Sequence, residues 1–288
     1  MNIEVKIINA FAVNGTGGNP AGVVLNADHL NTIQKQVVAK RLALPETAFV
    51  STSALADFRL EFFTPTKQIP HCGHATIATF TYLKKHGFIS GQHSSKETID
   101  GTRQIFFKDD LAFMEQQKPR FTFVSDEVPA ILHSLRLTNN DLLEGMELAI
   151  VNTGNNFLVV PIRDEKTLAS VQPDLDAISK ISERYNLIGY YLFTPTSGAN
   201  TRATTRMFGP YYGIPEEAGT GMAAGPLACY LYTVFNAKQE QFQIEQGRFM
   251  ATPSPSLLYV DLVIDEGQIE KLFVGGDAYV SNEISITI

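Results

Sequence analysis

The chain has 288 residues, of which 44% are hydrophobic and 18% are charged, and its formal net charge is −7. This composition is typical of a globular protein with one large or two medium domains, and it argues against disorder. No lysine and arginine cluster offers a footprint for nucleic acid, and no apolar run is long enough to cross a membrane. Two cysteines make no disulfide framework and the first residues do not resemble a signal peptide, so a cytoplasmic protein is expected.

The first half of the chain alternates between short strands and two helices. Residue alternation and turn signals predict strands at 3–13, 20–26, 46–50, 58–63, 103–107, 111–116 and 148–151. Helical spacing predicts helices at 30–42, with Asn31 or Thr32 as the cap, and at 73–86, where basic residues precede Gly87. The polar 90s are expected to form turns.

The second half has a similar order of elements. Strands are predicted at 153–162, 188–193 and 201–208, and helices at 174–185, capped by Asp174, and at about 220–235. Three or four strands then finish the chain. Many short strands with few helices indicate the α+β class and not a doubly wound parallel sheet.

One motif occurs in both halves. "FFTPTKQIPHCGHATIATFTYL" begins at Phe62 and "MFGPYYGIPEEAGTGMAAGPLACYL" begins at Met207. Each has Phe-x-Pro, then Ile-Pro, then a glycine-containing loop, then an apolar helix. Three positions correspond at a separation of 145 residues, and with one inserted residue two more correspond: Phe63 with Phe208, Pro65 with Pro210, Pro70 with Pro215, Cys72 with Ala218, and Gly73 with Gly219. We therefore expect two similar halves that face one another, each a strand layer wrapped on a helix.

Both loops end a strand and open a helix. Small residues there leave the first backbone N–H groups uncovered, and such a helix end favours anions, especially carboxylates. Two such ends facing one another would hold a small acid from both sides. In "GTG" at 219–221 the glycines allow close approach and Thr220 adds a hydroxyl. Since glycine-rich turns are also common without any ligand, only the pair of loops is informative.

The same residues bear on whether the site uses a metal ion or a thiol. Zinc needs three or four ligands, and His71, Cys72 and His74 have no second Cys/His cluster, so no metal is expected. A cysteine at a helix N-terminus is a credible base. Racemases without cofactors use two such thiols, but the partner position here is Ala218. Cys229 lies about ten residues into its helix, where packing in the core is expected. Single-thiol chemistry at Cys72 stays an alternative.

Two carboxylates and a histidine are the other candidates for acid–base work. Glu46 stands in the apolar segment "LALPETAFV", where burial would raise its pKa and let it take and give a proton near neutrality; it could also be an exposed turn residue. Glu217 adjoins the GTG loop, or is simply a helix-start glutamate favoured by the dipole. His74 either packs in the first turn of its helix or carries protons.

Four segments resemble the PhzF (phenazine biosynthesis) family: "GNPAGVVL" at 18–25, "LPETAFV" at 44–50, "FFTPTKQIPHCGHAT" at 62–76 and "RMFGPYYGIPEEAGTGMAAGPLACYL" at 206–231. The resemblance runs from about residue 8 to about residue 281. It implies a diaminopimelate-epimerase-like fold with two pseudo-symmetric domains, each a curled sheet around a central helix, and a site in the cleft between them. The expected halves are 1–118, joined by a last strand at about 277–288, and 119–276. A homodimer without metal or organic cofactor is also implied.

The resemblance also places the family's site residues. Its acid/base glutamate falls on Glu46 and its histidine on His74. Its second motif is usually Glu-Asp-Pro-Ala-Thr-Gly-Ser, so that an aspartate has become Glu217 and a serine has become Met222. These departures disfavour the phenazine precursor as the substrate.

We therefore expect a cofactor-independent isomerase or epimerase of a small carboxylic acid, with Glu46, His74 and Glu217 in catalysis. The residues expected to bind the substrate are Cys72, Gly73, Ala75, Thr76, Gly219, Thr220, Gly221 and Met222. A family member that binds a small acid without catalysis is the alternative.

Overall fold

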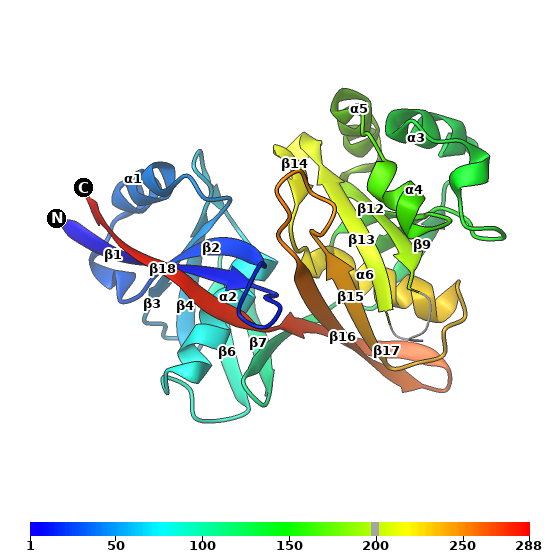
Figure 1. Ribbon diagram of the computed structural model, residues 1–288. Coiled ribbons are helices and arrows are strands. Elements are labelled where there is room, and N and C mark those ends of the chain that lie inside the picture. Colours follow the sequence, from blue (N-terminus) through cyan, green and yellow to red (C-terminus); the bar gives the residue numbers. More distant parts are fainter. Residues whose placement is uncertain (197–201) are drawn as a thin grey trace. The chain divides into compact units, whose positions relative to one another are not determined.

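The computed structural model describes residues 1–196 and 202–288, and the chain forms two compact units. Unit 1 comprises Met1–Glu115 and Gly275–Ile288, and unit 2 comprises Gln116–Val274. Both units combine short, mostly antiparallel strands with a few helices (Figure 1), which confirms the α+β class. The division into domains at 1–118 with about 277–288, and at 119–276, stays a prediction.

Unit 1 is a sheet in which two parallel pairings interrupt an antiparallel series. Strand β2 pairs antiparallel with β1 and parallel with β3; β4 pairs antiparallel with β3 and parallel with β6; β6, β7 and β8 are antiparallel. The strands are β1 (Asn2–Ala10), β2 (Asn19–Val24), β3 (Thr47–Ser51), β4 (Phe58–Phe63), β5 (Gln68–Ile69), β6 (His93–Thr98), β7 (Gly101–Lys108), β8 (Leu111–Gln116) and β18 (Ala278–Thr287); the helices are α1 (Thr32–Leu42) and α2 (Gly73–Lys85).

The two ends of the chain meet in unit 1. Strand β18 pairs antiparallel with β1 along its whole length, so both termini lie at the same edge (Figure 1). The Met1 amine donates to the Ile288 carbonyl at 2.6 Å. The last strand therefore completes the sheet that the first strand begins.

Helix α2 is the centre of unit 1. It contacts β1, β2, β3 and β18, and every residue from Gly73 to Leu83 is buried. A helix buried on all sides must satisfy its polar side chains internally. Thr76 and Thr79 do so by donating their hydroxyls to the carbonyls of Cys72 and Ala75, four residues earlier, at 2.6 and 2.7 Å.

Unit 2 repeats the pairing series of unit 1. Strand β11 pairs antiparallel with β10 and parallel with β12; β13 pairs antiparallel with β12 and parallel with β15; β15 and β16 are antiparallel. The predicted internal repeat is thus confirmed in strand topology. The strands are β9 (Arg120–Phe123), β10 (Ala149–Asn152), β11 (Asn156–Pro161), β12 (Leu187–Pro195), β13 (Arg202–Gly209), β14 (Ile214–Glu217), β15 (Gln241–Gln246), β16 (Ser256–Asp265) and β17 (Gln268–Gly276), which runs into the unit boundary.

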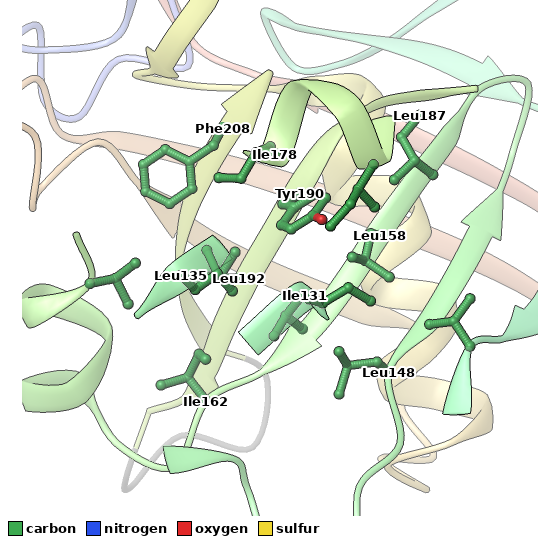
Figure 2. Packing of buried hydrophobic residues seen from close by; sticks show 14 of the residues in the cluster. Ile131, Leu135, Leu148, Leu158, Ile162, Ile178, Leu187, Tyr190, Leu192 and Phe208 are labelled. Carbon is green, nitrogen blue, oxygen red and sulfur yellow. The ribbon is translucent and has the colours of Figure 1, made fainter. Parts of the chain in front are cut away.

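The helices of unit 2 divide into one central helix and an outer layer. Helix α6 (Gly221–Thr233) corresponds to α2 and is nearly all buried. Helices α3 (Val128–Leu135), α4 (Glu165–Ser170) and α5 (Leu175–Tyr185) belong to the outer layer. Ile131 and Ile178 from this layer pack with Tyr190 and other strand residues in one hydrophobic cluster (Figure 2). As predicted, Asp174 caps α5 by accepting the Ala177 N–H at 3.0 Å.

Three expectations about local structure were wrong. Residues 93–98 form β6 and not a turn. The strand was not predicted because its buried residues, Ser94, Lys96 and Thr98, are polar and give no alternation of hydrophobic residues. The first strand ends at Ala10 because Phe11 adopts a left-handed backbone conformation with φ of 62°. Glu217 ends strand β14 and does not start a helix.

Several short elements have no clear signal in the sequence. The elements β5, β9, β14, α3 and α4 were not predicted; they are four-residue or shorter strands and helices of eight residues or fewer. The first residue of the strand expected at 201–208 lies outside the described residues. In the described part of the chain, no helix has the length and apolar character needed to span a membrane.

Candidate active site

Three side chains with acid–base chemistry meet at the N-terminal end of α2. His74 Nε2 lies 3.3 Å from Glu46 Oε2, and His74 Nδ1 lies 3.6 Å from Cys72 Sγ. One ring nitrogen of His74 therefore faces a carboxylate and the other faces a thiol. The structure thus brings together three of the predicted site residues, although 26 positions separate Glu46 from Cys72 in the sequence.

A close approach of two parallel strands places Glu46. The residue immediately precedes β3, and its carbonyl accepts the Gly22 N–H of β2 at 3.0 Å. A Cβ atom at Gly22 would lie 2.3 Å from Leu42 Cδ2 and 3.0 Å from Thr47 Oγ1, so a larger residue here would require these side chains to move. The "GNPAGVV" segment thereby fixes the backbone on which the carboxylate stands.

Burial controls the protonation of Glu46. Its side chain is only 12% exposed, and desolvation raises its pKa to about 7. Among the described residues, Oε2 accepts no hydrogen bond of good geometry, because the contact with His74 Nε2 is close but poorly aligned. A carboxyl group in this state exists in both forms near neutral pH, so it can accept a proton and return it.

The first turn of α2 presents backbone donors beside this group. Cys72 is the N-cap residue with an extended backbone, and its side chain makes no capping hydrogen bond. In the first turn Gly73 and Ala75, on either side of His74, are small, and the positive end of the helix dipole lies here. This turn has the chemistry to favour a carboxylate.

A buried lysine lies behind the turn. Lys96 of β6 is fully buried, and its Nζ donates to Thr76 Oγ1 at 2.6 Å and to His71 Nδ1 at 3.2 Å. Desolvation lowers the pKa of Lys96 to about 7. Burial and the charges of Lys96 and Arg103 lower the pKa of His71 well below its usual value, so this ring is neutral and accepts a hydrogen bond from the Lys96 amine. The sequence did not point to Lys96, because nothing in a polar segment signals a buried amine.

The second predicted loop, in unit 2, is held by a buried glutamine. Gln246 Oε1 accepts the Thr220 N–H at 3.0 Å, and its Nε2 donates to the Glu217 carbonyl at 2.7 Å. The Thr220 hydroxyl donates to the Glu217 carboxylate. Gln246 is 1% exposed and was not anticipated, because a single polar residue at the end of a strand is not distinctive in sequence.

Two more side chains contact this loop from within unit 2. Gln116 Nε2 donates to the Gly221 carbonyl at 2.9 Å, and Asn155 Nδ2 donates to Met222 Sδ at 3.5 Å. Ala218, Gly219 and the backbone of the loop are buried. Cys229 is fully buried in α6, which confirms its predicted place in the core, and burial raises the pKa of its thiol.

One group of side chains has the chemistry to hold a metal ion. The ligand atoms of Glu46, Cys72 and His74 lie within 4.8 Å of one another and comprise the oxygen, sulfur and nitrogen donors that zinc accepts. Glu46 was not expected as a ligand, because it lies far from the cysteine and histidine residues in the sequence. The positive charge of Lys96 near the thiol opposes a cation at this position. The absence of a metal requirement stays a prediction.

Comparisons with known proteins agree on one family. The family model described as phenazine biosynthesis-like protein (PhzC-PhzF) matches residues 8–283. An uncharacterized isomerase of Clostridium acetobutylicum is 33% identical, with 95% of this chain and 94% of that protein covered. The trans-2,3-dihydro-3-hydroxyanthranilate isomerase of Pseudomonas chlororaphis is 29% identical, with 94% of each covered. The crystal structure of a PhzF-family protein from Bacillus anthracis is 26% identical, with both chains covered completely and a TM-score of 0.87.

The site residues therefore form one group in each unit. Glu46, Cys72, His74 and Thr76 lie together in unit 1, whereas Glu217, Thr220 and Met222 belong to the loop of unit 2. That a single substrate contacts both groups stays a prediction.

Proposed function

Because the chain belongs to the phenazine biosynthesis-like (PhzC-PhzF) family of isomerases, we propose that it moves a proton within a small carboxylic acid, with Glu46 as both acid and base. One observation carries this proposal: the Glu46 carboxyl group, with a pKa of about 7, is buried against His74 at the N-terminal end of α2. A base, a proton partner and an anion-favouring helix end are thus combined in one place.

The chemical steps need only groups of this chain. The Glu46 carboxylate removes a proton from a carbon of the bound acid, and the C–H electron pair becomes part of an enolate-like system. Backbone N–H groups of the α2 turn stabilise the negative charge as it develops. Protonated Glu46 then returns the proton to another carbon, and the double bond shifts. His74, beside both Glu46 and Cys72, orients the carboxyl group and shares its proton.

A single base favours isomerisation over epimerisation. The same carboxyl group takes and returns the proton, so both steps occur on one face of the substrate. Inversion at carbon requires a second acid on the opposite face, as in two-base racemases. Glu217 is the candidate for that second acid, but its carboxylate already accepts the Thr220 hydroxyl. We therefore propose a shift of a double bond as the primary reaction.

Two residues argue that the substrate differs from the phenazine precursor. At the position where the family usually has aspartate, Glu217 reaches back to Thr220, and Met222 offers a sulfur that accepts from Asn155 in place of a serine hydroxyl. Met222 cannot donate a hydrogen bond to a substrate. We propose a small acid that needs no hydroxyl donor at this point.

Proton exchange in heavy water tests the proposal. The protein is incubated with a panel of small carboxylic acids, among them trans-2,3-dihydro-3-hydroxyanthranilate, and deuterium uptake is measured by mass spectrometry. A substrate found in this way should lose its exchange in Glu46→Gln, while a thermal-shift assay still detects binding. Glu97→Gln, which changes a half-buried glutamate of the same unit, is the matched control and should exchange normally. Uptake at the wild-type rate in Glu46→Gln would exclude Glu46 as the base.

Cofactor independence has its own outcome in the same assay. Exchange should persist after exhaustive dialysis against a chelator, because the proposed steps use only side chains and backbone amides. Loss of exchange on chelation and recovery with zinc would instead assign a metal to Glu46, Cys72 and His74. Acids that stabilise the protein but never exchange would favour the binding-protein alternative.

Thiol chemistry is a second candidate, because Cys72 Sγ lies 3.6 Å from His74 Nδ1. A cysteine paired with histidine can ionise and act as a base. In this case Cys72→Ser should abolish exchange and Glu46→Gln should leave it. Full exchange in Cys72→Ser would dismiss the thiol.

A further inference from the structure

Lys96 is a buried amine that has no carboxylate within ion-pair distance in the two described ranges. The residue has no exposed surface. Its contacts are neutral: the Thr76 hydroxyl, the His71 ring and, at 5.3 Å from Nζ, the face of Phe62. A buried charge is normally paired, and one left unpaired is costly. This cost calls for a reason beyond packing.

The other buried lysine of unit 1 shows the usual arrangement. Lys35 of α1 is also buried, but its amine forms an ion pair with Glu61 of β4. The two lysines thus lie in the same unit at similar depth, and only one has a counter-charge. The contrast singles out the environment of Lys96 and supplies an internal control.

The position of Lys96 links it to the candidate active site. Its amine donates to Thr76 Oγ1, and the Thr76 hydroxyl in turn donates to the Cys72 carbonyl at 2.6 Å. This chain of hydrogen bonds runs from β6 to the N-cap of α2. Lys96 thereby fixes the turn whose amide groups face the site.

The charges that act on Lys96 come from Arg103, Asp100 and Cys72. Arg103 of β7 lies opposite Lys96 in the strand register and adds positive charge. Asp100 of the β6–β7 turn has the weakest electrostatic influence on the pKa of Lys96, and the His71 ring is neutral. After burial, the Cys72 thiol has the largest influence on the pKa of Lys96, and it raises that pKa. An anion at the turn beside Cys72 would supply the counter-charge that Lys96 lacks.

We infer that Lys96 is a positioning residue of the candidate active site, which holds the Cys72–Thr76 turn and supplies a buried positive charge that favours an anion there. The inference rests on the proposed function, because the anion is taken to be the carboxylate and enolate-like charge of the substrate. Lys96 does not touch the substrate, since its amine is enclosed by Thr76, His71 and Phe62. Its influence passes through Thr76 and through its field.

The Cys72 thiol reports this field without any substrate. The thiolate absorbance of the full-length protein is followed against pH, and the signal of Cys72→Ser is subtracted so that Cys72 alone is measured. Below about pH 7, where Lys96 is largely protonated, the thiolate fraction in Lys96→Met should be about tenfold lower than in the wild type, because a nearby positive charge favours the ionised thiol. Lys35→Gln, which changes the paired lysine, should titrate like the wild type.

A second variant separates charge from hydrogen bonding and covers the case in which Lys96→Met does not fold. Lys96→Gln keeps a donor for Thr76 but loses the charge, so its thiol should titrate like that of Lys96→Met. If Lys96→Gln titrates like the wild type, the lysine acts only as a structural donor and the inference is overturned. Heavy-water exchange by Glu46→Gln is a separate measurement, so failure of either proposal can be recognised without the other.

Discussion

At the scale of single residues, Glu46 should make stability depend on pH. The pKa of its carboxyl rises from the usual 4.5 to about 7 in the folded protein. Between these values the folded protein keeps a proton that the unfolded chain releases, so the free energy of unfolding falls as pH rises from about 4.5 to about 7. The difference corresponds to about 3 kcal/mol at most.

Glu46→Gln should remove this dependence. The variant and the wild type should have similar stability near pH 4, where Glu46 is mostly protonated in both the folded and the unfolded wild type, and the variant should be more stable by about 2–3 kcal/mol near pH 8. Urea unfolding at several pH values measures the difference. Lys96 also titrates, but it is present in both proteins and cancels. A difference that does not change with pH would show that Glu46 is solvated like an ordinary glutamate.

At the scale of elements, the β2–β3 pair should be the most sensitive support of the site. Gly22→Ala inserts a methyl group against Leu42 and Thr47, and overpacking of this kind costs about 1–3 kcal/mol. Relief of the clash would shift the residue before β3, which is Glu46, so the rate of proton exchange should fall by more than the loss of folded protein explains.

Two further variants test the cause of this effect. Gly91→Ala adds a methyl group whose nearest atoms lie 3.8 Å away, so it should change neither stability nor exchange. Leu42 is half-buried and meets the new methyl group with the end of its side chain, so Gly22→Ala combined with Leu42→Ala should recover part of the exchange. Normal exchange in Gly22→Ala would mean that the register does not place Glu46.

The elements that could be predicted from the sequence have apolar residues at a regular helical or strand spacing, or have clear capping and turn residues at their ends. Helices α2 and α6 follow matching Phe-x-Pro and Ile-Pro segments, and α5 starts at Asp174 and has apolar residues at helical spacing. Strand β6 was missed because its inward positions are serine, lysine and threonine. The burial of a lysine depends on tertiary contacts with α2 and β4, which no local pattern encodes.

The candidate site was predictable to the same extent. Glu46 and His74 could be singled out because one lies in an apolar segment and the other in a glycine-bounded turn. Their contact depends on the β2–β3 register and could not be read from spacing. Gln246 and Lys96 escaped notice because the sequence does not show which polar side chains are enclosed.

At the scale of the whole molecule, the repeat is shared but the chemistry is not. Both units have the same pairing series and a buried central helix, yet the N-cap region has Cys72 in unit 1 and Ala218 in unit 2. The residue before β3 is Glu46, whereas the residue before β12 is Asn186. The base of the proposed reaction is therefore present in one unit only, and unit 2 would contribute binding.

This division of labour predicts different effects for substitutions in the two units. Thr220→Val in unit 2 removes a hydroxyl that donates to Glu217 and accepts from Gln246 Nε2. If its loop holds the substrate carboxylate, KM should rise severalfold while the exchange rate at saturation changes little, because Glu46 is intact. Glu46→Gln should instead abolish the rate at saturation. Steady-state exchange in heavy water separates the two effects.

A matched control shows whether a change in KM could result from a general loss of packing. Thr81→Val changes a fully buried threonine of α2 in the same way but outside the turn at the start of the helix, so it should leave KM unchanged. An unchanged KM in Thr220→Val, in a protein that is fully folded by thermal unfolding, would show that the loop of unit 2 takes no part in binding. Unit 1 would then have to bind and convert the acid alone, and the resemblance between the two loops would reflect shared ancestry of the fold and not a shared substrate.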